Sequence, residues 1–196
     1  MVGVVYIALT LWRYDGDPLS FALVGTRYSD NNPQGTEGYD GQFAYYIARD
    51  PLEGWRHCDV PAYRYQRILY PMLSWLLALG RPTLVPWTLI LVNLAALAAG
   101  TWFTERLVTS RGVSGWYALA YGLYGGLMAG LRLDLTEPLA YGLVQGGLWA
   151  WAEERHGLGA GLLALAALAK ETALIAVAGL LLYLLVQGRW QEGLRL

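Results

Sequence analysis

The sequence predicts an all-α membrane protein, a polytopic bundle of about six transmembrane helices with two interfacial amphipathic helices in a long outer loop. Of the 196 residues, 56% are hydrophobic and only 15% are charged, against averages of roughly 45–50% and 25% in soluble domains. The apolar residues gather in long uncharged runs, while polar residues concentrate in one segment near the amino terminus. The formal net charge of −1 offers no basic surface, so we expect no nucleic-acid partner.

Three uncharged runs in the second half of the chain predict spans. Residues 83–104 are the clearest, 22 residues in which Asn93 is the only strongly polar member. At 1.5 Å per residue, a helix of this length crosses a hydrocarbon core of about 30 Å. Residues 112–131 form a second run of 20 residues, and residues 139–152 form a third, shorter one. We predict that each run crosses the membrane.

Two further regions complete the predicted bundle. Residues 157–186 are apolar except for Lys170-Glu171-Thr172 near the middle. Because a charge in lipid costs several kcal/mol, we predict two short helices with these residues at the turn. Val2–Trp12 is short for a span but lacks the basic start and cleavage site of a signal peptide. Treating residues 1–196 as a single domain, we predict a first span over residues 1–13, five more within residues 83–187, and a cytoplasmic tail over residues 188–196.

Residues 14–82 differ in composition and predict a large extramembrane loop rich in Asp, Gly, Asn, Pro and Arg. Within Tyr39–Arg49, bulky residues recur at helical spacing until Asp50-Pro51 ends the helix. Within Tyr65–Leu79, an Arg-bearing start leads into apolar residues with the same spacing, over a length too short to cross a membrane. We predict that both helices lie in the membrane interface.

The arginines predict the orientation of the bundle. If residues 14–82 lie outside, the short inner loops carry five arginines, whereas the short outer turns carry Arg132 and Lys170. Positive charge in short loops favours the cytoplasmic side. The long loop and three polar clusters are therefore predicted to share the outer face.

The first polar cluster is Gly38-Tyr39-Asp40-Gly41-Gln42-Phe43, at the start of the first interfacial helix. Two interpretations of Asp40 remain open. Its carboxylate could cap the helix by accepting backbone N–H bonds. Alternatively, a carboxylate at the membrane surface could act as a general base, with the flanking glycines letting a substrate approach the backbone closely.

The second cluster is Arg132-Leu133-Asp134-Leu135-Thr136-Glu137-Pro138. One interpretation is a capping box, in which Asp134 or Thr136 starts the next helix and Glu137 reaches back. The other is a pair of carboxylates, Asp134 and Glu137, that orient sugar hydroxyls or bind a metal such as Mg²⁺ or Mn²⁺. The single Cys58 and the two histidines cannot complete a Cys/His zinc site.

The third cluster is Tyr63-Arg64-Tyr65-Gln66-Arg67, whose two arginines share a helix face. Arginine beside tyrosine at an interface is often a snorkelling anchor. Alternatively, Arg64 and Arg67 grip a phosphate or pyrophosphate group, and Lys170 adds a further cation unless it belongs only to a salt-bridged turn.

Together these features resemble the GT-C superfamily of integral-membrane glycosyltransferases, which use sugars linked to polyprenyl phosphate. The matching segments are GYDGQFAYYIARDP, YRYQRILYP, RLDLTEP and LAKETAL, in that order along nearly the whole chain. The resemblance implies a multi-pass protein of a bacterial plasma membrane with its active face outside, acting on a polyprenyl-phosphate sugar donor.

The resemblance also implies roles for particular residues. Asp40 would be the general base, and Asp134 and Glu137 would be the assisting acids or, if a metal binds, its ligands. Arg64, Arg67 and Lys170 would meet the donor phosphate. Further substrate-binding candidates are Gln42, Tyr45 and Arg132.

Two features depart from the superfamily pattern. Members usually continue beyond a sixth span, and the first span here is short, so we expect either a fragment or a reduced protein completed by a protein partner. A non-catalytic membrane subunit that packs in a larger complex is therefore the alternative function, favoured by glycines that permit close helix contacts. A transporter is a third hypothesis, disfavoured because nearly all charges lie at the predicted surfaces.

Overall fold

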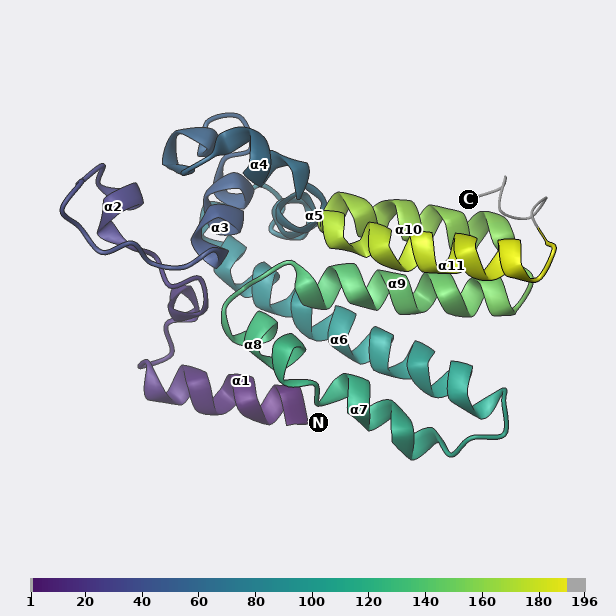
Figure 1. Ribbon diagram of the computed structural model, residues 1–196. Coiled ribbons are helices and arrows are strands. Elements are labelled where there is room, and N and C mark those ends of the chain that lie inside the picture. The colour runs from purple at the N-terminus through teal and green to yellow at the C-terminus, as the bar shows by residue number, and fades with distance from the viewer. Residues whose placement is uncertain (1, 190–196) are drawn as a thin grey trace.

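In the computed structural model, residues 2–189 are described and form eleven α-helices and five short 3₁₀ helices, with no strand among them (Figure 1). The all-α prediction is confirmed for this part of the chain. The predicted tail over residues 188–196 lies almost entirely outside the described residues.

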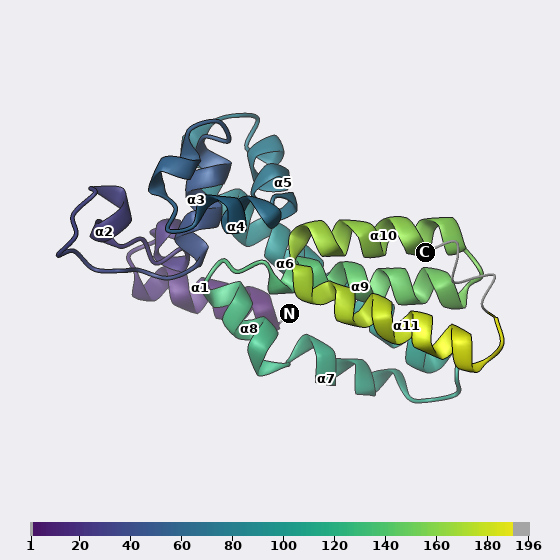
Figure 2. The ribbon, with the colours of Figure 1, turned by 45° about the horizontal axis from the view of Figure 1, so that its top comes forward.

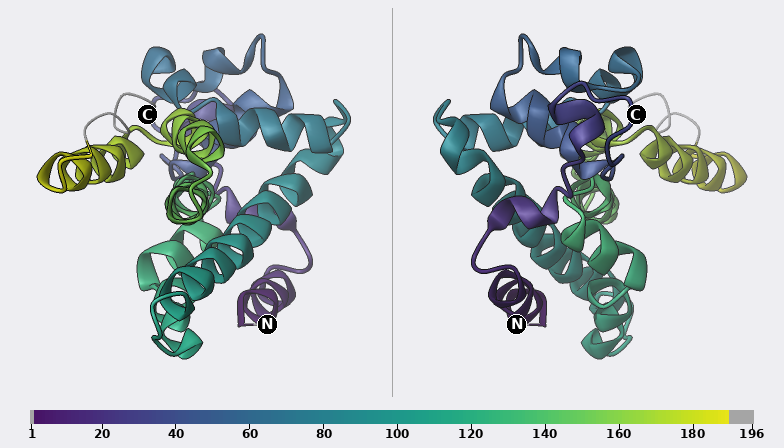
Figure 3. Two further views of the ribbon diagram at one scale, coloured as in Figure 1. Left: turned by 90° about the vertical axis from the view of Figure 1, so that its right-hand side faces the viewer. Right: turned by 90° about the vertical axis from the view of Figure 1, so that its left-hand side faces the viewer.

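The five longest helices of residues 2–189 run along the length of the molecule (Figure 1). They are α1 (Val2–Arg13), α6 (Val85–Thr109), α9 (Glu137–Ala152), α10 (His156–Ala169) and α11 (Leu174–Val186). α9 packs against both α6 and α10. Seen end-on in Figure 3, α1 and α11 lie at the periphery, and α6 and α9 lie between them.

Only one helix of residues 2–189 is long and apolar enough to cross a membrane by length and composition. It comprises α6 and the preceding 3₁₀ turn, 28 residues with a mean hydropathy of 1.7 in its most apolar window. Val2–Arg13, His156–Ala169 and Glu171–Val186 are shorter apolar helices. A buried core helix of a soluble protein meets the same test, and the six-span arrangement stays a prediction.

The predicted span over residues 112–131 is not one helix. It is divided into a 3₁₀ turn at Gly115–Ala118, α7 (Leu119–Gly122) and α8 (Gly125–Arg132). Tyr124 is extended at the break, with a ψ of 124°. Glycine has low helix propensity, and Gly122, Gly125 and Gly126 lie around Tyr124, so the helix is interrupted there.

Residues 14–84 form a polar lobe of short helices at one end of the bundle (Figure 1). The first predicted interfacial helix is α3 (Gly41–Arg49), which ends at Asp50 as expected. The second is divided into α4 (Pro61–Gln66) and α5 (Leu69–Leu77). All residues of α3 from 41 to 48 are buried, because α3 packs against α5 and α6. α3 is therefore an internal helix of the lobe rather than a helix lying along its surface. The lobe also contains α2 (Thr26–Ser29) and 3₁₀ turns at Pro18–Phe21 and Gly54–His57.

A buried polar network joins the lobe to the long helices. Tyr70 of α5 is fully buried, and its hydroxyl donates to the Leu89 carbonyl of α6 at 3.1 Å. Asn93 Nδ2 donates to the same hydroxyl at 2.8 Å and to the Leu135 carbonyl at 2.9 Å. The one polar residue of the clearest predicted span therefore connects α6, α5 and the loop before α9.

Candidate functional site

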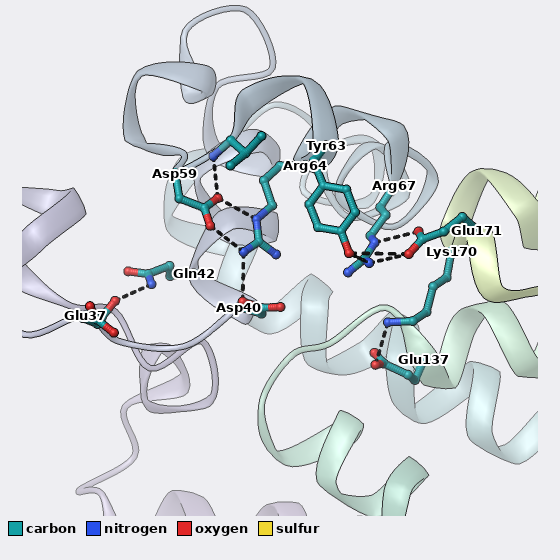
Figure 4. A network of polar contacts seen from close by, with 11 residues as sticks. Glu37, Asp40, Gln42, Asp59, Tyr63, Arg64, Arg67, Glu137, Lys170 and Glu171 are labelled. Carbon is teal, nitrogen blue, oxygen red and sulfur yellow. Dashed lines mark hydrogen bonds and ion pairs between the residues drawn. The ribbon is translucent and has the colours of Figure 1, made fainter.

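The polar clusters meet where the lobe rests on the bundle, around a cavity of about 120 Å³. Asp40, Arg64, Arg67, Asp134 and Glu137 all line it. Lys170, in the turn between α10 and α11, is paired with Glu137 at the same place (Figure 4). Residues from four separate parts of the sequence are thus brought together in one site.

Asp40 stands at the N-cap position of α3, but its side chain makes no capping hydrogen bond. Instead, its Oδ1 accepts a hydrogen bond from Arg64 Nη2 at 3.0 Å. The Asp40 side chain is 52% exposed, so part of the carboxylate stays open to the cavity and to solvent. The capping interpretation of Asp40 is therefore wrong, and the carboxylate is oriented by an arginine.

The glycines beside Asp40 face protein backbone rather than open space. A Cβ on Gly41 would lie 2.1 Å from the Leu133 carbonyl oxygen, which no real structure allows. Gly38 has a φ of +70°, and a Cβ there would lie 2.4 Å from the Leu23 carbonyl oxygen. These glycines let the chain fold tightly, and the expectation that they admit a substrate to the backbone is not met.

Arg64 is held by two acids. Its Nε and Nη2 donate to the two carboxylate oxygens of Asp59 at 2.8 and 2.9 Å, and Nη2 also donates to Asp40. Its guanidinium lies 4.1 Å from the Phe43 ring centroid. Burial would lower the pKa of Arg64, but the hydrogen bonds to Asp59 and Asp40 raise it above its ordinary value. The hydrogen bond from Arg64 lowers the pKa of Asp59.

Arg67 makes a similar pair with an acid from a distant part of the chain. Its Nε and Nη2 donate to Glu171 at 2.9 and 2.6 Å, and Nη2 also contacts the Tyr63 hydroxyl. The hydrogen bonds from Arg67 lower the pKa of Glu171 to about 2. The side chains of Arg64 and Arg67 are only 10% and 12% exposed, so neither extends into solvent as a snorkelling anchor does.

The second cluster does not form a capping box. Thr136 is the N-cap residue of α9 but makes no side-chain capping bond. Glu137 does not reach back to it and instead accepts a hydrogen bond from Lys170 Nζ at 2.8 Å. Thr172, beside that lysine, shares a hydrogen bond with Tyr141 at 3.0 Å. As predicted, the Lys170-Glu171-Thr172 segment forms the turn between two helices.

Asp134 lies beneath the cavity and is fully buried. Its backbone is in the left-handed region, with a φ of +48°. The Tyr70 hydroxyl, whose single proton is shared between the Leu89 carbonyl and this carboxyl group, lies 3.5 Å from Oδ1, and Oδ2 has no partner. Burial raises the pKa of Asp134 well above its ordinary value, against the smaller effects of Tyr70 and Arg132. Burial therefore favours the protonated form of Asp134 over the charged form. Among residues 2–189, no three His, Cys, Asp or Glu side chains converge as a metal site. Asp134 and Glu137 both line the cavity, and their role as a carboxylate pair stays a prediction.

Three of the predicted substrate-binding residues lie away from the cavity. Gln42 is buried and bonds the Gly25 amide and the Glu37 carbonyl at 3.1 and 2.7 Å. Tyr45 is buried in the main core cluster. Arg132 donates to the Ser20 carbonyl at 2.9 Å and lies over the Tyr14 and Phe21 rings. All three residues hold the polar lobe together.

The sequence interpretation missed Asp59 and Glu171 as site residues. Glu171 was within the predicted turn, but only contact across 104 residues reveals its pairing with Arg67. Asp59 precedes the Arg-bearing helix α4 and had no pattern of its own. The signal that could have identified Asp59 is an acidic residue just over one helical turn before an arginine, here Arg64.

Comparison with known proteins gives no relative from which a function could be transferred. No family model matches the chain. No curated protein matches it, and no solved structure matches it.

Proposed function

We propose that this chain is a membrane glycosyltransferase, or the amino-terminal part of one, that transfers a sugar from a polyprenyl-phosphate donor to an acceptor outside the cytoplasm. The observation that carries the proposal is the single cavity lined by an exposed carboxylate, Asp40, and two nearly buried arginines, Arg64 and Arg67. Sugar transfer from such a donor requires a general base for the acceptor hydroxyl and cationic groups that bind the donor phosphate. Asp40 supplies the first, and Arg64 and Arg67 supply the second.

Asp40 would act as the general base. It takes the proton of an acceptor hydroxyl as that oxygen attacks the anomeric carbon. The bond from the anomeric carbon to the phosphate oxygen then breaks, and polyprenyl phosphate leaves with the bonding electron pair. Its growing negative charge is stabilised by Arg64 and Arg67, whose Nη1 groups donate no hydrogen bond to residues 2–189. Attack opposite to the leaving group inverts the anomeric carbon.

The helix arrangement supports a six-span membrane topology. The polar lobe, the loop before α9 and the turn between α10 and α11 lie at one end of the bundle, where Arg67 contacts Glu171 and Lys170 contacts Glu137 (Figure 4). In the six-span topology, successive helices cross the membrane in alternating directions, and this end of the bundle would lie outside. The six crossings are made by α1, α6, α7–α8, α9, α10 and α11. A donor anchored in the outer leaflet would then meet the cavity at the membrane surface, which reduces the entropic cost of the encounter.

The decisive experiment is Asp40→Asn, with Asp15→Asn as a matched control because Asp15 is exposed and outside the cavity. The full chain, in vesicles with a radiolabelled lipid-linked sugar extract, is assayed for loss of label from the lipid-linked fraction. We expect Asp40→Asn to lower the rate by about 10²–10⁴-fold, the usual contribution of a general base, and Asp15→Asn to leave it unchanged. Undiminished transfer by Asp40→Asn would refute the assignment of the base.

A second function is favoured by a different observation. α11 presents large apolar side chains outward, with Ile175 and Val186 more than two-thirds exposed. In a non-catalytic subunit, this face would pack against a protein partner that completes the bundle. Native mass spectrometry of the chain from its own membranes separates the two functions. Retained polyprenyl phosphate that is lost with Arg64→Ala/Arg67→Ala supports the transferase, whereas a stoichiometric protein without that lipid supports the subunit.

A further inference from the structure

A second cavity of about 570 Å³ lies between α7–α8 and α9. Its volume is within the range of about 300–1,000 Å³ that ligand pockets span. Figures 1 and 2 both show α7 and α8 running beside the longer helices. Tyr124 and Leu127 line one wall of the cavity, and Glu137, Tyr141 and Gln145 line the other. We call it the α9 groove. Glu137 also lines the first cavity, so the two cavities meet at this residue.

The α9 wall of the groove is a polar stripe. Glu137, Tyr141 and Gln145 are spaced four residues apart and therefore share one helix face. At 1.5 Å per residue, Gln145 lies about 12 Å along the helix from Glu137. Glu137 is paired with Lys170, and Tyr141 is bonded to Thr172. The Gln145 amide makes no hydrogen bond to any described residue. In the six-span topology, this amide would lie well inside the hydrocarbon region, where an unpaired polar group is costly.

The unpaired Gln145 amide in the polar stripe of α9 indicates which kind of molecule would bind in the groove. A polyprenyl chain is pure hydrocarbon and offers no hydrogen-bonding atom to Gln145. A glycerolipid carries ester carbonyls and hydroxyls directly beside its acyl chains. Such a lipid could accept a hydrogen bond from the Gln145 amide while its chains contact Tyr124 and Leu127. The head group of a phospholipid, which extends beyond the ester carbonyls, would then point along α9 toward Glu137, at the boundary with the cavity that Asp40 lines.

We propose that the α9 groove binds a glycerolipid from the membrane, and that this lipid is the acceptor of the transferred sugar. Its role as acceptor rests on the proposed function, whereas the binding of the lipid rests on the groove alone. The donor and the acceptor then approach the first cavity from different sides. The donor phosphate meets Arg64 and Arg67, whereas the acceptor enters beside Glu137.

The test places the photoreactive residue p-benzoylphenylalanine at Tyr124, which lines the groove and is exposed, so that the Gln145 amide stays intact. The full chain is placed in vesicles that contain diacylglycerol, phosphatidylethanolamine and undecaprenyl phosphate. Leu182, on the outward face of α11 and 63% exposed, is the control position. Crosslinked lipids are identified by mass spectrometry. We expect position 124 to capture glycerolipid at least ~5-fold over its share of the vesicle, as one directed hydrogen bond from Gln145 allows, and position 182 to capture lipids in proportion. Proportional capture at position 124, preferential capture of undecaprenyl phosphate or no capture would each overturn the proposal.

A second variant tests the amide itself without disturbing the fold. With the photoreactive residue at the exposed Tyr124, Gln145→Leu keeps the side-chain size and removes the amide. We expect the preference for glycerolipid to disappear, and an unchanged preference would contradict the role of Gln145.

The lipid-binding proposal and the proposed transferase function can be refuted independently of each other. If Asp40→Asn abolishes transfer and the groove shows no lipid preference, only the groove proposal fails. If the groove selects glycerolipid and Asp40→Asn transfers normally, only the proposed base fails.

Discussion

Arg67, between α4 and α5, donates two hydrogen bonds to Glu171, in the turn between α10 and α11, at 2.9 and 2.6 Å. The residues are 104 positions apart, so this pair fixes the polar lobe onto the far end of the chain. Lys170 and Glu137 make a parallel connection to the start of α9. The shape of the first cavity therefore depends on two ion pairs between separate elements.

The Arg67–Glu171 pair predicts an acid-dependent loss of stability. The pKa of Glu171 falls from an ordinary 4.5 to about 2 in the folded chain. A lowered carboxyl pKa stabilises the fold fully above the unfolded pKa, and this stabilisation is lost as the pH falls from about 4.5 towards 2. Because Glu171 is 41% exposed, we expect solvent screening to reduce the contribution to about 1 kcal/mol.

Thermal unfolding of wild type and Glu171→Gln across pH checks this expectation. The variant should melt a few degrees lower at pH 7, and the difference should shrink steadily below pH 4.5. A difference that persists unchanged at pH 3 would contradict the assigned ionisation. Glu154→Gln, at an exposed position between α9 and α10, is the control and should melt as wild type does throughout.

Gly41→Ala should disrupt the site. The added Cβ would lie 2.1 Å from the Leu133 carbonyl oxygen, so the start of α3 must move away from the loop that holds Asp134. We expect a loss of about 2–4 kcal/mol in the free energy of unfolding, as for other severe steric conflicts in packed cores. Gly161→Ala is the matched control, because a Cβ there meets nothing within 4 Å inside α10. It should be neutral or stabilise by up to about 1 kcal/mol, and equal effects of the two substitutions in denaturant unfolding would argue against this packing.

Asp134→Asn should be tolerated. Burial raises the pKa of Asp134, so the folded chain binds a proton that the unfolded chain releases above its ordinary pKa of 3.8. Stability contributed by this group therefore falls as the pH rises above about 3.8. Asparagine has the same shape without the proton to lose, so the variant should match wild type near pH 4 and equal or exceed its melting temperature at pH 7. A large loss at both pH values would show that the carboxyl group itself is needed.

Asp59→Asn should displace Arg64. The carboxylate of Asp59 accepts two hydrogen bonds from Arg64 and holds its guanidinium toward Asp40. Asparagine offers only one acceptor oxygen, so we expect about 10-fold weaker retention of undecaprenyl phosphate, roughly the effect of one charged hydrogen bond. Native mass spectrometry measures the retention. Glu53→Gln is the control, since Glu53 pairs with the exposed Arg56 outside the cavity. Equal retention by wild type and Asp59→Asn would exclude a positioning role.

Local patterns predicted the elements wherever one stretch of chain decides its own conformation. The apolar run at 83–104 falls almost wholly within α6, and the Lys170-Glu171-Thr172 turn forms where the charges interrupt an apolar tract. Asp50 ends α3 because the following Pro51 disfavours helix at that residue. The run at 112–131 shows the limit of this approach, since hydrophobicity alone gave no sign of the break at Tyr124.

By itself, the sequence determined that the chain is helical, where its polar clusters lie and which of their residues are charged. Only the tertiary structure decided which of them meet. Asp40 and Arg64 pair across α3 and α4, whereas Gln42, two residues from Asp40, turns into the lobe. The physical reason is that an ion pair or a cavity depends on packing between distant segments, and helical periodicity describes only one segment at a time. Burial, which raises the pKa of Asp134 well above its ordinary value, is likewise a property of the assembled fold.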